Sequence, residues 1–224
     1  MNEPTDSRAD TTRQQILRAA AHQFARRPYH EVGLDDILAD AELTKGAMYF
    51  HFRSKHALAL AIIEAQTVAA TAAIQDLLGR KLSGLETLVD FIYLIAVQDL
   101  AEDRARAALH LLETVGRAEE FQTRLQDGWI ESIALVAERA IGEGDIIKDC
   151  DPHDVGRLLV SLYLGMRYTS KLDKAERFLL DLEKSWALVL PGIVHADRIS
   201  YFRQFIRRRT TLAISAAGQA AGGG

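Results

Sequence analysis

The chain has 224 residues, of which 48% are hydrophobic and 26% are charged, so it can bury the core of one large domain or of two unequal ones. Its single cysteine, Cys150, excludes an internal disulfide and favours the cytoplasm. We see no apolar signal segment and no stretch that we expect to span a membrane, so we predict a cytoplasmic protein without a membrane partner. Scarce proline and abundant alanine and leucine favour an all-α fold.

The net charge of −4 is unevenly distributed along the chain. Residues 1–56 carry eight basic and eight acidic side chains, residues 57–197 carry fourteen and twenty-three, and residues 198–224 carry five arginines and no acid. The acidic surplus therefore lies in the middle of the chain. Local charge governs contact with phosphate, so this balance does not argue against a DNA-binding N-terminal segment.

The N-terminal segment reads as three helices. Residues 11–27 show an apolar stripe at helical spacing and end at Pro28. Residues 33–52 read as a short helix, a turn at Glu42 and Leu43, and a second short helix that Thr44 caps with its hydroxyl. This is the layout of a helix-turn-helix, whose second helix enters the DNA major groove.

The second helix of this motif carries the chemistry of a DNA interface. Residues 43–56 include three cations and no acid. Lysine can bind guanine O6 or N7, Tyr49 lies one turn after Lys45, and Gly46 permits close backbone approach. The residues we predict to contact DNA are Thr44, Lys45, Gly46, Tyr49, His51 and Lys55. The alternative is a solvated helical hairpin with a few basic residues.

Further helices are expected over residues 55–78, 85–100, 103–115, 119–141, 152–172, 173–190 and 197–209. Ser54 is placed to cap the first of these helices, and Pro152 occupies a first-turn position of the helix that starts at residue 152. We expect the Ala- and Gly-rich residues 210–224 to form a flexible tail. The arginines of the last helix, of which Arg209 is one, form a solvated face or add contacts to DNA.

Two features of the longer segment allow alternatives. Residues 154–169 and 175–189 are apolar on more than one side, as in a dimer interface or a buried helix pair. The other helices carry apolar residues beside a few polar ones, as in a small-molecule pocket or an ordinary core. A helical enzyme acting on an ester or lactone would use His110 with Glu113 or His153 with Asp154, but no catalytic or metal-binding motif accompanies either pair.

The run from Leu43 to Leu58, LTKGAMYFHFRSKHAL, resembles the recognition-helix segment of TetR-family transcriptional regulators. The resemblance is specific over about residues 11–63, and Gly33 departs from it where the family usually has Ser or Thr. It implies an all-α fold of about nine to ten helices, with a DNA-binding domain at 11–56 and a ligand-binding and dimerisation domain at 57–209. It also implies a homodimer on a palindromic operator, with the interface residues Tyr163, Phe178, Leu182, Trp186 and Val189.

The same run, followed by Trp129 in GWIESI, is similar to the γ-butyrolactone receptors of actinobacteria. In those proteins a tryptophan near this point lines the hormone pocket, so the resemblance implies a repressor that a small amphiphilic effector releases from DNA. The expected pocket residues are Trp129, Phe91, Ile95, Leu112, Ile133 and Tyr163. A core tryptophan, and a DNA-binding regulator that has a filled body and no effector, remain the alternatives. We expect no cofactor and no metal.

Overall fold

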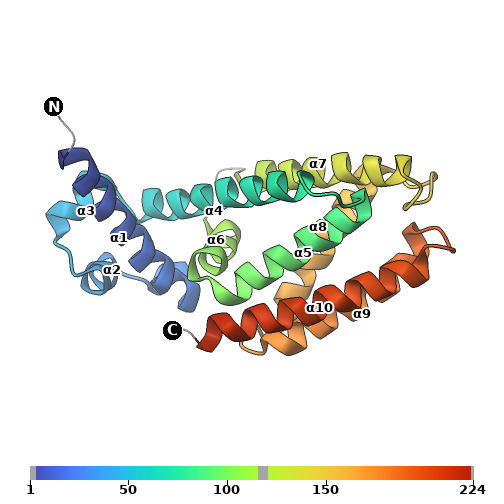
Figure 1. The fold of residues 1–224 in the computed structure, drawn as a ribbon. Coiled ribbons are helices and arrows are strands. Elements are labelled where there is room, and N and C mark those ends of the chain that lie inside the picture. The colour runs from blue at the N-terminus through green and yellow to red at the C-terminus, as the bar shows by residue number, and fades with distance from the viewer. Residues whose placement is uncertain (1–3, 116–120, 223–224) are drawn as a thin grey trace. The chain divides into compact units, whose positions relative to one another are not determined.

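A computed structural model describes residues 4–115 and 121–222, which are all-helical apart from turns and one isolated β-bridge between Ile146 and Val194 (Figure 1). The chain forms two compact units. Of the described residues, the first unit contains 4–70, 102–115 and 121–123, and the second contains 71–101 and 124–222. The predicted all-α fold is therefore confirmed. This division differs from the predicted domain boundary at residue 56, because residues 103–114 pack with the N-terminal segment.

The first unit holds the helix-turn-helix. It comprises α1 (Pro4–Arg26), the 3-10 helix η1 (Tyr29–Glu31), α2 (Leu34–Ala41), α3 (Lys45–His51), the first part of α4 (Lys55–Leu78) and α6 (Asp103–Thr114). Its core contains Ile16 and Phe24 of α1, Ile37 of α2 and Met48 of α3, each no more than 1% exposed. These apolar side chains hold α2 and α3 against α1, so the exposed side of α3 has a fixed direction.

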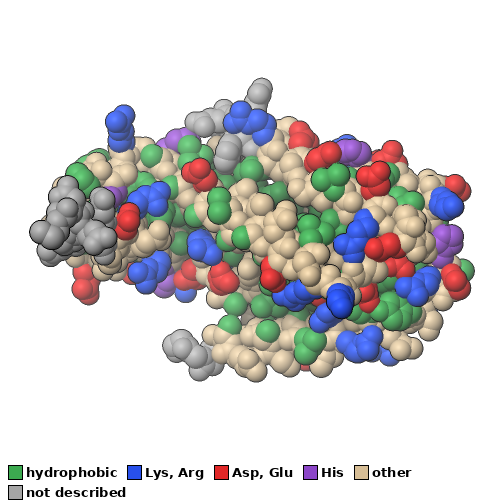
Figure 2. Space-filling model, turned by 45° about the horizontal axis from the view of Figure 1, so that its top comes forward, with side chains coloured by type: hydrophobic (Ala, Val, Ile, Leu, Met, Phe, Trp, Pro, Cys, Tyr) green, Lys and Arg blue, Asp and Glu red, His purple; other side chains and the backbone are tan. Residues whose placement is uncertain are grey.

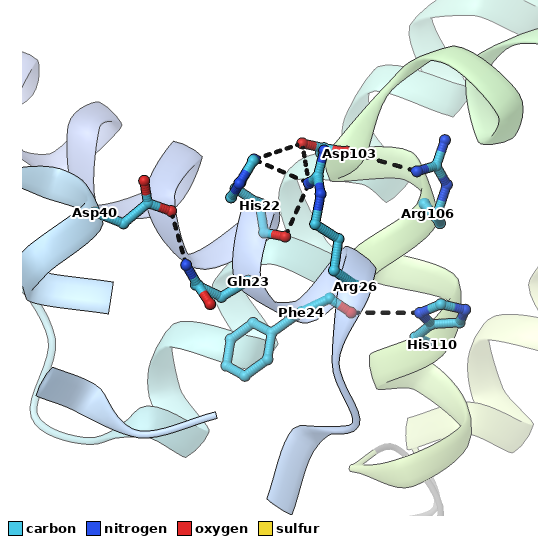
Figure 3. Close-up of polar contacts among 8 residues, drawn as sticks. All are labelled: His22, Gln23, Phe24, Arg26, Asp40, Asp103, Arg106 and His110. Carbon is cyan, nitrogen blue, oxygen red and sulfur yellow. Dashed lines mark hydrogen bonds and ion pairs between the residues drawn. The ribbon is translucent and has the colours of Figure 1, made fainter. Parts of the chain in front are cut away.

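A polar cluster joins α6 to α1 within this unit (Figure 3). Asp103, the first residue of α6, accepts hydrogen bonds from Arg26 at 2.7 Å and from His22 at 3.0 Å, both on α1. Seven residues after Asp103 on α6, the Nδ1 atom of His110 lies 3.3 Å from the carbonyl oxygen of Phe24. These contacts, together with buried alanines and leucines of α6, explain why α6 belongs to the first unit.

The second unit consists of the end of α4 with α5 (Gly84–Ala101), the main part of α7 (Phe121–Gly142), α8 (Pro152–Thr169), α9 (Ala175–Ile193) and α10 (Ile199–Gly222). Two glycines let its helices pack closely. A Cβ on Gly84 would lie 2.6 Å from the Ala140 nitrogen of α7, and one on Gly156 would lie 2.6 Å from the Ile130 oxygen. The helix α7 therefore packs against both α5 and α8.

A buried ion pair lies inside the second unit. The Arg167 Nε of α8 donates to the Asp99 carboxylate of α5 at 2.8 Å, and the Tyr163 hydroxyl donates to the same oxygen at 3.2 Å. Both charged side chains are at most 4% exposed. Burial, and then the Asp99 charge, raise the pKa of Tyr163 well above its usual value, so its hydroxyl stays protonated and donates.

The structure corrects the expectation of a flexible tail from residue 210. The helix α10 continues through Gly222, and Thr210, Ala213 and Ala217 are buried along one side of it. Alanine is the strongest helix former, and burial of this side against the unit adds stability that the composition alone did not reveal. Arg209 is held by Asp90 of α5, with 2.7 Å between Arg209 NH2 and Asp90 Oδ2, so it belongs to the packing rather than to a solvated face.

One further expectation needs correction. By length and composition α4 could cross a membrane, since it has 24 residues and an 18-residue window within it has a mean hydropathy of 1.7. Core helices of globular proteins meet the same criteria, and its buried residues Leu58, Ile62 and Ile63 lie in the first unit. Acidic and basic side chains are interspersed over the face shown in Figure 2.

Candidate nucleic-acid interface

The turn before α3 lies at Glu42 and Leu43, where the sequence predicted it. Glu42 adopts a left-handed backbone with φ of 54°, and the Leu43 N–H donates to the carbonyl oxygen of Leu38 at 3.0 Å. Thr44 then caps α3, because its hydroxyl accepts from the Ala47 N–H at 3.3 Å. These bonds satisfy backbone groups that would otherwise lack partners at the helix ends. The expected cap of α3 is thus confirmed.

The start of α2 lacks a side-chain cap, as the glycine at position 33 predicted. Gly33 has no oxygen to offer, but its own N–H donates to the Asp36 carboxylate at 2.9 Å. That hydrogen bond, followed by one from Arg27, lowers the pKa of Asp36 below its usual value. Asp36 therefore fixes the entry into α2 in place of a Ser or Thr hydroxyl.

One side of α3 is exposed and forms a continuous strip. Met48 and Phe52 are buried, whereas Lys45, Gly46, Tyr49 and Phe50 are exposed to solvent. Tyr49 is 54% exposed and Phe50 is 79% exposed, which is unusual for aromatic side chains. We call this surface the α3 strip, and it consists of Lys45, Gly46, Tyr49 and Phe50 of α3 together with the exposed Arg53, which follows the end of the helix.

Gly46 has room around it within the chain. A Cβ at this position would meet only the Thr44 hydroxyl oxygen, at 3.9 Å, which is ordinary contact. The packing of the chain therefore does not require glycine here, although alanine would favour the helix by roughly 1 kcal/mol. The smallest residue stands on an exposed helix where only an outside partner would need the space.

The predicted contact residues divide into two groups. Thr44, Lys45, Gly46 and Tyr49 are exposed on or beside the strip, and His51 is half-buried with its ring against the edge of Phe50. Lys55 is different. Its ammonium donates to the carbonyl oxygens of Tyr29 and Val32, each at 2.9 Å, and lies 4.3 Å from the centre of the Tyr29 ring. It is thus engaged in bracing the turn that precedes α2.

Sequence reasoning missed three residues of this surface. Phe50 follows Gly46 at four-residue spacing within α3, so the helical period could have identified it. Arg53 lies beyond the end of α3 at His51 and after the extended Phe52, so the helical period does not place it. Asp35 of α2 could not be found in this way. Its carboxylate lies 2.8 Å from the Lys45 ammonium, and only the angle between the two helices brings them together.

The structure also gives the burial of the residues that we predicted for the dimer interface and for the effector pocket. Tyr163, Phe178, Leu182 and Trp186 are buried within the second unit, where the rings of Tyr163 and Phe178 meet edge to face, and Val189 is half-buried. Trp129, Phe91 and Ile95 are half-buried in that unit, and Ile133 is buried. Leu112 is buried in the first unit. The six predicted pocket residues therefore do not all belong to one unit.

The polar pairs considered for catalysis have structural partners or lie on the surface. His110 contacts the Phe24 carbonyl, and His153 is exposed with its Nε2 3.5 Å from the Glu131 carboxylate. Within residues 4–115 and 121–222 no group of three or more His, Cys, Asp or Glu side chains could hold a metal ion.

Comparisons with known proteins agree with this geometry. The family model for bacterial regulatory proteins of the tetR family matches residues 16–62. The A-factor receptor protein of Streptomyces griseus is 28% identical over 88% of this chain and 69% of its own length. A crystal structure of a γ-butyrolactone receptor, described as ArpA-like, is 31% identical, with a TM-score of 0.77 over 91% of this chain and 98% of that one.

A second solved structure includes DNA. It contains the TetR family protein CprB of Streptomyces coelicolor in complex with its biological operator sequence. That chain is 31% identical to this one, with a TM-score of 0.79 and coverage of 91% of this chain and 98% of that one.

Proposed function

We propose that this chain, which belongs to the TetR family of bacterial regulatory proteins, is a cytoplasmic homodimeric repressor that a small γ-butyrolactone-like amphiphile releases from a palindromic operator. The family consists of DNA-binding transcriptional regulators and not of enzymes. The observation that carries the proposal is the α3 strip, in which an exposed helix side with lysine, tyrosine and an unpacked glycine is followed by an exposed arginine. The likeness to γ-butyrolactone receptors supports the effector class.

Each residue of the strip has a role suited to its chemistry. Lys45 reaches a guanine O6 or N7, since it lies at the N-terminal end of α3, which approaches the bases most closely. Thr44, Tyr49 and Arg53 offer hydroxyl or guanidinium donors to phosphate oxygens, and His51 offers a ring N–H. Gly46 lets the backbone approach the groove edge. Lys55 contributes by holding the turn before α2, and a phosphate contact would use its remaining donor.

The dimer that we propose uses the outer sides of α8 and α9. Leu158 and Tyr168 are exposed on α8, and Leu180 and Leu188 are exposed on α9, while the inner sides carry the buried Tyr163, Phe178, Leu182 and Trp186. A second copy of the chain would cover the outer residues in a two-fold interface. Such a dimer would present two α3 strips to half-sites about 34–36 Å apart.

The effector site that we propose lies in the second unit. Trp129, Phe91, Ile95, Ile133 and Tyr163 supply apolar surface there. Among the described residues, the Gln98 Oε1 and the Trp186 Nε1 are buried without a hydrogen-bond partner. A ligand with a carbonyl, a hydroxyl and an alkyl chain suits such surroundings, and it releases DNA if it binds the DNA-free state more tightly.

A gel shift tests the proposal. DNA from upstream of the protein's own gene is shifted by the purified dimer, and a panel of γ-butyrolactones and related amphiphiles is titrated in. We expect one compound to release the DNA, and we expect Trp129→Ala to need at least tenfold more of it. A shifted band that no compound releases would favour the regulator without an effector, and no shift with any DNA would overturn the proposal.

A further inference from the structure

Asp35 occupies a distinctive place beside the α3 strip. It lies in the first turn of α2, and its Oδ1 is 2.8 Å from the Nζ of Lys45, the first residue of α3. The start of α2 is fixed by Asp36, whose carboxylate accepts the Gly33 N–H, so Asp35 is not needed as a cap. Its closest charged neighbour is the side chain that we assign to base contact.

The contact between Asp35 and Lys45 has little value for stability. Their side chains are 76% and 66% exposed, and exposed ion pairs contribute little to folding. The hydrogen bond and the charge of Asp35 raise the pKa of Lys45, so the ammonium remains charged. The pair is therefore easily opened, and its main effect is to orient the lysine and to place a negative charge at the DNA-facing surface.

That negative charge opposes binding to arbitrary DNA. A carboxylate beside the strip is repelled by the phosphates of any duplex, and it competes with phosphate for Lys45. Only a base pair that offers a donor to the carboxylate compensates for this loss. Adenine N6 is also such a donor, but a G·C pair matches the two side chains best, because guanine presents two acceptors to the lysine and cytosine presents the N4 amino donor beside them.

We propose that Asp35 is a specificity-determining residue, which accepts from a cytosine N4 while Lys45 donates to the paired guanine. Side by side, the two side chains present the acceptor and the donor that one G·C pair requires. On other sequences Asp35 lowers the affinity. This inference rests on the proposed function, since it requires the α3 strip to enter the major groove.

Asp35→Asn tests the inference, because it removes the charge and keeps the shape. The probes are an operator selected from a random duplex library with the parent protein and a duplex of unrelated sequence, both measured by fluorescence anisotropy. We expect affinity for the unrelated duplex to rise about eightfold at about 0.1 M salt, as the released Lys45 neutralises one more phosphate. The slope of log K against log salt should steepen by about 0.9.

Base preference provides the second measurement. On the selected operator, replacing one G·C pair in each half-site should weaken the parent by about 5- to 150-fold. Asp35→Ala, which removes the acceptor that Asp35→Asn keeps, should lose most of this discrimination at that single position. Asp40→Asn is the matched control. It removes the same charge from the same helix, but its carboxylate accepts from Gln23 of α1 at 3.1 Å. We expect its base preference and its salt slope to match the parent.

Each outcome is decisive. If Asp35→Ala keeps the base preference of the parent, if Asp35→Asn keeps its salt slope, or if Asp40→Asn changes both equally, the inference is overturned while sequence-specific binding by the parent stands. If the parent selects no operator from the library, the proposed function itself fails, and the inference fails with it.

Discussion

At the scale of single residues, the packing of the chain does not require glycine at position 46, whereas the proposed DNA contact does. Its surroundings would accept a methyl group without a close contact, since the nearest atom would lie 3.9 Å away. A fold that only needed a stable helix would gain from alanine at this position. The free space is explained by the close approach of an outside partner, which the proposal identifies as DNA.

We therefore expect Gly46→Ala to have opposite effects on stability and binding. The free energy of unfolding in urea should stay equal or rise by up to about 1 kcal/mol, because alanine favours the helix. Operator affinity should fall at least tenfold, because the methyl group would stand between the backbone and the groove. Gly128→Ala on α7, where a Cβ would meet nothing within 4 Å, is the control and should leave binding unchanged.

Lys55 leads to a different expectation from Lys45. Lys55→Met removes an ammonium that donates to two carbonyl oxygens and should lower the free energy of unfolding by about 1–2 kcal/mol. The salt slope of operator binding should remain that of the parent if bracing is the main role. A slope shallower by about 0.9 would instead show that Lys55 neutralises a phosphate. The exposed Lys81 provides the control substitution.

At the scale of elements, the attachment of α6 to α1 is the feature that the sequence least suggested. Asp103 receives two hydrogen bonds from α1, and Arg106 lies 3.7 Å from its other oxygen. Burial raises the pKa of Asp103, but the hydrogen bonds and charges of Arg26 and His22 have a larger effect. The pKa of Asp103 is therefore lower than the usual aspartate value of 3.8. The ionised carboxylate thus holds α6 to α1.

Asp103→Asn should weaken this junction. Because the carboxylate is only 29% exposed and accepts from a guanidinium, we expect the free energy of unfolding to fall by about 1–2 kcal/mol at neutral pH. The depressed pKa gives stability that is present above pH 3.8 and is lost as the pH falls through the folded value. The difference between parent and variant should therefore shrink in acid.

Hydrogen exchange of α1 measures the same junction locally, and Glu102→Gln is the control. Glu102 is exposed and lies 3.7 Å from Arg104, so its loss should change little. Equal protection of α1 in the parent and in Asp103→Asn would contradict the role assigned to Asp103.

At the scale of the whole molecule, the outer sides of α8 and α9 carry the exposed apolar residues that self-association would cover. Leu188 is 83% exposed, so a charge placed there meets no atom of its own core. We expect Leu188→Glu to weaken dimerisation at least tenfold, as measured by light scattering across a dilution series. Leu212→Glu, at an exposed leucine of α10, should dimerise like the parent. Equal association of all three proteins would place the interface elsewhere.

Local patterns were sufficient to predict most of the helices and the Thr44 and Ser54 caps, because each depends on neighbours in the chain, but they did not predict that α10 continues to Gly222. Local sequence patterns could not predict contacts between residues that are distant in the chain. The ion pair of Asp35 with Lys45, the bracing by Lys55 and the packing of α6 on α1 all join residues that only the fold brings together. Apolar residues lie on more than one side of α8 and α9, so the sequence alone could not show which sides are buried within the unit and which are exposed.

The most direct test of the account is the affinity of Lys45→Ala for an operator selected with the parent protein. By fluorescence anisotropy we expect binding about 5- to 150-fold weaker than that of the parent, with base preference relaxed at one position of each half-site. Lys81→Ala should bind like the parent. Equal operator affinity of Lys45→Ala and the parent would contradict the account, because the α3 strip would then not read the DNA.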